Sequence, residues 1–137
     1  MDRFKLTDVW KESGITKNYE YGILTNEIYK SWSGMKASEY KVFKGIRKES
    51  LRDNMSDIEI ASTDLGEIAT RELASVHKPF GLEENKQIAK MSGHAAKVAR
   101  EDIEKNLGKS VITSKNTLHY KYIDEEKEIE NKNEVRL

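Results

Sequence analysis

Apolar residues recur at steps of three and four along two long stretches, from Ser56 to Lys78 and from about residue 82 to 107. The two stripes consist of Ile58, Ala61, Leu65, Ile68, Ala69, Leu73 and Val76, and of Ile88, Met91, Ala95, Val98, Ala99, Ile103 and Leu107. This spacing places each stripe on one side of an α-helix, where we expect it to face the core. Small residues such as Gly66 and Gly93 interrupt the stripes and allow two backbones to approach closely. The pattern predicts a helical hairpin over residues 56–107.

Start and stop signals bound the two helices of this hairpin. Ser56-Asp57-Ile58-Glu59 reads as a capping box, in which the Ser56 hydroxyl and the Glu59 carboxylate accept hydrogen bonds from each other's backbone amides. Pro79, the one proline of the chain, ends the first helix in the turn HKPFG. Gly108 stops the second helix.

Three short aromatic-rich stretches precede the hairpin, and each ends at a glycine. They are FKLTDVWKES (4–13), NYEYGILTNEIYKSWSG (18–34) and ASEYKVFKG (37–45). We expect short helices whose rings form one end of the core, since each buried ring removes a large apolar area from water. Ser50 is expected to cap a short turn that follows.

The chain after the hairpin changes in character twice. Residues 109–120, KSVITSKNTLHY, hold a β-branched run that predicts an edge strand or an extended segment lying on the hairpin. Residues 121–137 are highly charged, which favours a frayed or flexible tail. The fold class predicted is all-α, with one small helical domain over residues 1–120 and a charged tail over 121–137.

The composition of the chain indicates its cellular compartment and excludes some kinds of chemistry. The 137 residues include no cysteine, and 24 basic residues balance 24 acidic ones. The absence of cysteine excludes disulfides and thiolate chemistry and agrees with a reducing cytoplasm. The N-terminal stretch MDRFKLTDVWK lacks the apolar region of a signal peptide, and no apolar run approaches the roughly 20 residues of a membrane span. We therefore expect a cytoplasmic protein.

Motifs for catalysis, cofactors and metals are not found in the sequence. The three histidines, His77, His94 and His119, lack metal-ligand spacing, and neither a phosphate-binding glycine loop nor a GxSxG elbow is present. The carboxylates lie among lysines, as surface ion pairs do. We expect no enzyme activity, no cofactor and no metal.

Basic residues form the best candidate binding feature. Arg47, Lys48 and Arg52 precede the capping box, and Lys86, Lys90 and Lys97 follow one side of the second long helix. With neighbouring aromatic rings they could contact phosphates and stack on unpaired bases. Glutamates interleave with them, so an ion-paired helix surface is the simpler interpretation. An apolar face for a protein partner or for a homodimer competes equally with nucleic acid.

A set of ordered motifs resembles a known family. The strings ILTNEIYKSWSGMKASEYKVFKG, ESLRDNMSDIEIASTDLGEIATREL and FGLEENKQIAKMSGHAAKVAREDIEKNLGKSVITSKN are similar to the C-terminal region of the bacterial DNA damage-inducible protein D family. The resemblance runs from about Leu6 to Asn116. It departs from the family at Ser92-Gly93, at Ala96-Lys97 and in the turn FGLEEN. The BRO-type N-terminal domain, which that family shares with phage antirepressors, has no counterpart here, so DNA recognition credited to it is not carried over.

The resemblance implies a non-enzymatic interaction module of the DNA-damage (SOS) response or of phage and mobile-element regulation. Its protein partner would be a regulatory protein or a recombinase filament on single-stranded DNA. A direct DNA-binding module that uses the basic helix face is the alternative. Among the positions that match the family pattern, Arg52 and Arg100 are the ones expected to have a second use, because a guanidinium binds carboxylate or phosphate through two hydrogen bonds.

Overall fold

The computed structural model describes residues 3–117, with side chains from Leu6 onward. This part of the chain forms α1 (Arg3–Glu12), α2 (Asn18–Ser33), α3 (Ala37–Lys44), the 3₁₀ turn η1 (Arg52–Asn54), α4 (Asp57–His77) and α5 (Gly81–Leu107). No strand occurs among residues 3–117, so the all-α prediction is confirmed, and residues 109–116 form an irregular segment rather than an edge strand. The predicted tail, 121–137, lies outside the described residues.

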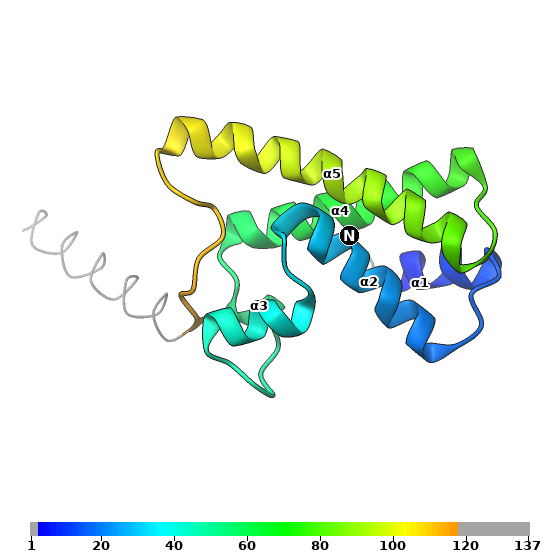
Figure 1. The fold of residues 1–137 in the computed structure, drawn as a ribbon, viewed down its shortest axis with the longest axis horizontal. Helices are drawn as coiled ribbons and strands as arrows, with labels where there is room; N and C mark the ends of the chain where they lie inside the picture. Colours follow the sequence, from blue (N-terminus) through cyan, green and yellow to red (C-terminus); the bar gives the residue numbers. More distant parts are fainter. Residues whose placement is uncertain (1–2, 118–137) are drawn as a thin grey trace, which may run out of the picture.

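The two longest helices, α4 and α5, form the predicted antiparallel hairpin (Figure 1). Helix α2 crosses the hairpin and packs mainly against α5. Helix α1 lies beside α4 at the end of the hairpin where the turn is, and α3 lies near the opposite end. The short N-terminal helices thus cover one face of the hairpin.

The helix ends follow the sequence signals closely. The Ser56 amide donates to Glu59 Oε1 at 3.0 Å and the Glu59 amide donates to Ser56 Oγ at 3.3 Å, which confirms the capping box. Helix α5 stops at Gly108, whose φ of 72° is left-handed. Helix α4 ends one residue before Lys78, which takes a φ of 48° ahead of Pro79.

The faces on which α4 and α5 pack are not the predicted apolar stripes. The buried residues of α4 are Glu59, Ser62, Thr63, Gly66, Glu67, Thr70 and Ala74, and those of α5 are Asn85, Ile88, Ala89, Ser92, Gly93 and Ala96. Of the two stripes, Ile88 alone is buried. Leu65, Val76, Met91 and Val98 expose 41, 75, 47 and 52% of their surface. The expectation that the stripes face the core is therefore wrong.

Close approach of the helices explains why small residues occupy the buried faces. A Cβ added at Gly66 would lie 2.8 Å from Ile28 Cγ2, and one added at Gly93 would lie 2.3 Å from Ser31 Cβ. The hydroxyl groups on these faces find hydrogen-bond acceptors within their own helix. Thr70 Oγ1 and Ser92 Oγ donate to the carbonyls of Gly66 and Ile88 at 2.7 and 2.8 Å. Burying these groups therefore leaves no hydroxyl without a partner.

A buried polar cluster ties the end of the described chain to the core. Lys44, in α3, and Glu59, in α4, form an ion pair at 2.9 Å whose side chains are fully buried, and Tyr40 donates to the same carboxylate. Lys44 Nζ also donates to the carbonyls of Thr113 and Lys115, both at 2.8 Å. The segment after α5 is thereby held against α3 and α4.

Candidate interaction surfaces

Both arginines that were expected to have a second use are engaged inside the fold. Arg52 forms a two-pronged pair with Asp64, with N–O distances of 2.8 and 2.9 Å, and this hydrogen-bonded pairing raises the pKa of Arg52. Arg100 Nη1 pairs with Glu104 at 2.9 Å, and its Nε donates to the carbonyl of Trp32 at 3.0 Å. The guanidinium groups bind carboxylates of the same chain, so the structure gives them a role in the fold, and their use for a partner or a phosphate stays a prediction.

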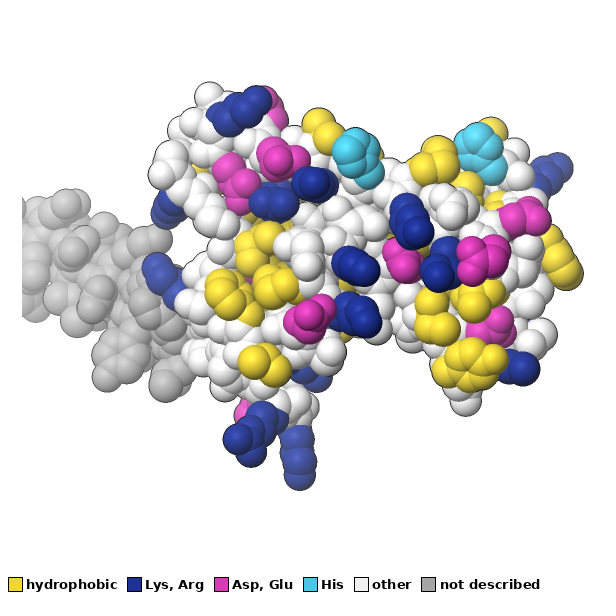
Figure 2. All heavy atoms as spheres, in the orientation of Figure 1, with side chains coloured by type: hydrophobic (Ala, Val, Ile, Leu, Met, Phe, Trp, Pro, Cys, Tyr) yellow, Lys and Arg dark blue, Asp and Glu magenta, His cyan; other side chains and the backbone are white. Residues whose placement is uncertain are grey.

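The remaining predicted basic residues lie on the surface in two separate elements. Arg47 and Lys48 are exposed in the loop between α3 and η1, and Lys90 and Lys97 are exposed on α5. On the same helix, Lys86 Nζ lies 3.8 Å from Glu83 Oε1. Figure 2 shows basic and acidic side chains mixed over the visible face, without a broad basic patch. This mixture is what the interleaved glutamates predicted.

Positions that carry the family resemblance are used to build the fold. Asn26 Oδ1 accepts from the amide of Ala37 at the start of α3, at 3.0 Å. Asn54 Nδ2 donates to the carbonyl of Ser50, and Asn54 Oδ1 accepts from the amide of Thr117 at 2.9 Å. Gly66 and Gly93 sit at the crossings with α2. These residue types are required by capping, by attachment of the segment after α5 and by close packing, and they do not form a shared exposed site.

A groove lies at the end of the molecule where α1 meets the hairpin turn, and we call it the hairpin-end groove. It has a volume of about 470 Å³ and is lined by Val9, Glu12, Ser13, Arg71, Glu72, Ala74, Ser75, Lys78, Pro79 and Phe80. Its volume falls in the range of ligand-sized clefts. Phe80 is 70% exposed there, although its ring lies against Gly14. The sequence signal for this groove was the HKPFG turn, which we interpreted as a helix stop.

Charges of both signs surround this groove. Arg71 Nη2 lies 3.7 Å from the Glu72 carboxylate, and Glu12 and Lys78 add one charge of each sign. Lys78 is the one non-glycine residue with a left-handed backbone among residues 3–117. Strained backbone of this kind often occurs at functional sites. The groove therefore combines the exposed ring of Phe80, the Arg71–Glu72 pair and the left-handed backbone of Lys78 at its edge.

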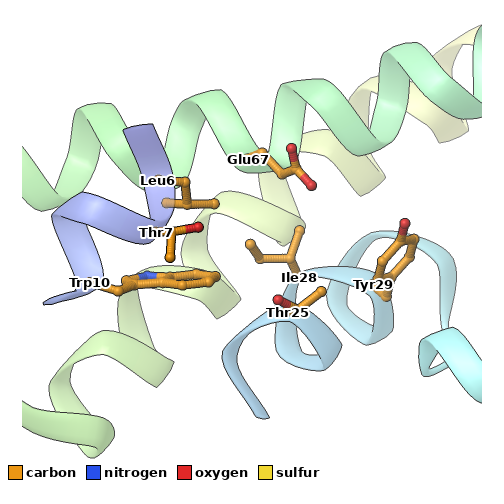
Figure 3. Close-up of a pocket in the computed structure, with 7 residues that line it drawn as sticks. All are labelled: Leu6, Thr7, Trp10, Thr25, Ile28, Tyr29 and Glu67. Carbon is orange, nitrogen blue, oxygen red and sulfur yellow. The ribbon is translucent and has the colours of Figure 1, made fainter. Parts of the chain in front are cut away.

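A second, smaller cavity lies between α1, α2 and α4 (Figure 3). It measures about 50 Å³, and Leu6, Thr7, Trp10, Thr25, Ile28, Tyr29 and Glu67 converge on it. The buried indole Nε1 of Trp10 has no hydrogen-bond partner within the described part of the chain. A space of this size fits a water molecule and is far too small for a cofactor.

Glu104, near the end of α5, has a lowered pKa in the folded chain. Burial alone would raise this pKa, but hydrogen bonds from the amide of Val111, at 2.8 Å, and from Arg100 outweigh it and lower the pKa. The ionised carboxylate is thus the form that the fold favours. Arg100 and Glu104 therefore act together as a structural clamp.

Comparison of the chain with protein-family models, curated proteins and solved structures found no match. Over the described residues, no group of three or more His, Asp or Glu side chains is placed to hold a metal ion. None of the helices described is long and apolar enough to cross a membrane.

Proposed function

We propose that this chain is a non-enzymatic protein-interaction module that docks a partner segment in the hairpin-end groove. The observation that carries the proposal is Phe80, a large ring that is 70% exposed beside the apolar groove residues Val9, Ala74 and Pro79. Aromatic anchors in concave, partly apolar sites supply most of the binding energy in protein interfaces. A charged rim adds orientation and selectivity.

The partner that fits this groove presents an apolar residue flanked by charged ones. Arg71 and Lys78 can receive carboxylates, and Glu12 and Glu72 can receive basic groups. The cytoplasmic DNA-damage response, or phage and mobile-element regulation, is the setting implied by the family resemblance. A recombinase filament on single-stranded DNA is therefore the first partner to test, and regulatory proteins of the same response come next.

Replacing Phe80 tests this proposal. Phe80→Ser removes the anchor but places a favoured N-cap residue at the start of α5, so the fold should tolerate it. We expect binding to a recombinase filament, measured by biolayer interferometry, to weaken about 10- to 100-fold, as for the loss of one buried aromatic anchor. Phe43→Ser, at an exposed phenylalanine of α3 outside the groove, is the matched control and should bind as the native chain does. Equal binding by both variants would remove the groove from the function.

Direct DNA binding is the second candidate, because three lysines share one side of α5. Rotation of 100° per residue puts Lys86, Lys90 and Lys97 within about 40° of each other around the helix axis. If this side binds phosphates, Lys86→Glu with Lys90→Glu should lower DNA affinity and flatten its salt dependence between roughly 50 and 200 mM. Fluorescence anisotropy with single- and double-stranded DNA measures both. No binding by the native chain at 50 mM salt would exclude this candidate.

A further inference from the structure

An exposed apolar surface covers the side of the hairpin opposite α2, and we call it the back face. Its central side chains are Leu65 of α4 and Met91 and Val98 of α5, which are exposed, and Ile68 of α4, which is half-buried. Gly66 and Gly93 mark the opposite side of each helix, because both contact α2. At 100° per residue, Met91 and Val98 point about 160° and 140° away from Gly93, and Ile68 points about 160° away from Gly66.

The apolar residues of the two helices are centred at the same height along the hairpin. Gly66 and Gly93 are level with each other, since added Cβ atoms would lie 2.8 Å from Ile28 Cγ2 and 3.1 Å from the Ile28 carbonyl oxygen. In an antiparallel pair, Leu65 is then level with His94, since Leu65 lies one residue before Gly66 in α4 and His94 lies one residue after Gly93 in α5. Met91 and Val98 lie about one turn on either side of this level. The back face therefore has a centre about which it is nearly symmetric.

We propose that the back face binds a second copy of this chain across a twofold axis at that centre. The axis passes between His94 and Ala95, so that α5 of one copy runs antiparallel to α5 of the other. This pairing places Met91 opposite Val98 of the second copy, and Val98 opposite Met91. Each contact is made twice, as in every isologous interface.

Charges at the ends of α5 match in the same register. The axis between His94 and Ala95 brings Glu84 opposite Lys105 of the second copy, and both residues are exposed. One oxygen of Glu84 accepts from the amide of Phe80 at 3.1 Å, which leaves the other oxygen for the lysine. The chain has 24 basic and 24 acidic residues, so two copies carry no net repulsion.

The size of the back face is sufficient for a weak but specific dimer. From Ile58 to Val76 the face runs roughly 27 Å at 1.5 Å per residue, and two helices at 8–10 Å spacing make it about 20 Å wide. Each copy would then bury roughly 500 Å², or about 1,000 Å² in total, which reaches the lower limit for specific interfaces. A micromolar dissociation constant is expected at this size.

The dimer goes beyond the proposed function and uses a different surface. The hairpin-end groove begins about 15 residues from the axis along α5, so two copies would place their grooves roughly 45 Å apart at opposite ends. A partner made of repeating subunits could then be bound at two points, which raises overall avidity. Loss of the dimer should reduce avidity without changing binding to one groove.

Analytical ultracentrifugation of the full chain tests the surface. We expect the native chain to form a dimer of twice 15.8 kDa at tens of micromolar. Val98→Lys should weaken dimerisation at least 100-fold, because the symmetric interface contains the substitution twice. Val42→Lys, at an exposed valine of α3 outside the back face, is the matched control and should remain dimeric. A native chain that is monomeric at several hundred micromolar, or a dimeric Val98→Lys variant, would overturn the proposal.

A charge exchange tests the register. Lys105→Glu should weaken the dimer about 3- to 10-fold by placing like charges opposite each other, and adding Glu84→Lys should restore it. Because the native chain has no cysteine, Ala95→Cys should also give a disulfide-linked dimer on mild oxidation, whereas Lys48→Cys should not. Circular dichroism verifies that each variant is folded. Failure of both rescue and cross-linking would refute this axis, and the result of the Phe80→Ser binding test would be unaffected.

Discussion

Gly93→Ala should destabilise the protein, although alanine is the better helix former. The added Cβ would lie 2.3 Å from Ser31 Cβ and 3.1 Å from the carbonyl oxygen of Ile28, and both atoms belong to or adjoin the backbone of α2. No rotamer change can relieve these contacts, so α2 and α5 must move apart. Overpacking of this kind costs about 1–3 kcal/mol, and loss of the close-packed Ser and Thr contacts along the crossing adds to it.

Helix propensity opposes this cost by about 1 kcal/mol. Two clashes at once place the overpacking cost at the upper end of its range, so we expect a net loss of roughly 1–2 kcal/mol in the free energy of unfolding. This loss lowers Tm by about 4–8 °C for a domain of this size. Gly22→Ala is the matched control, since Gly22 lies in α2 with nothing within 4 Å of its Cβ position. That variant should be stabilised by up to about 1 kcal/mol. Urea unfolding followed by circular dichroism measures both, and a Gly93→Ala variant as stable as the native chain would refute the close-crossing argument.

Two further predictions concern the polar contacts that hold the segment after α5. Lys44→Met should cost about 3–5 kcal/mol of stability because it leaves the Glu59 carboxylate buried without its cation. Amide hydrogen exchange around Thr113 should accelerate, since Lys44 donates to the Thr113 carbonyl. Unchanged exchange would show that Lys44 does not hold the segment after α5. Glu104 has a lowered pKa in the folded state, so its contribution is present at neutral pH and is lost as pH falls through that pKa. Glu104→Gln should therefore be less stable than the native chain at pH 7, and the difference should shrink as the pH falls and Glu104 is protonated, whereas a difference that does not change with pH would assign the loss to packing at Val111.

Much of the secondary structure could be predicted from local chemistry. The Ser56–Glu59 capping box, the glycine stops and Pro79 act within a few residues, so the sequence around each is sufficient to place it. The bidentate use of Arg52 and Arg100 could be predicted as a chemical capacity, but not its target. Asp64 lies 12 residues from Arg52, and the Trp32 carbonyl lies 68 residues from Arg100. Only the folded chain brings these groups together.

The hairpin-end groove could not be predicted from the sequence for a similar reason. Its lining comes from the end of α1 and from the α4–α5 turn, and no periodicity links these segments. Phe80 stands in a turn, where an aromatic residue more often packs than projects. Its ring lies against Gly14, which follows α1, and 70% of the residue remains exposed.

Local signals along the chain were sufficient to predict that it is helical, where its helices begin and end, and that residues 56–107 form a hairpin. Which side of each helix is buried was decided only in three dimensions. Hydrophobic spacing identifies an apolar stripe, but helices that cross as closely as α2 and α5 need small side chains between them, and hydroxyl groups that bond to their own helix fit there at little cost. Residues such as Leu65 and Val98 were consequently left on the surface.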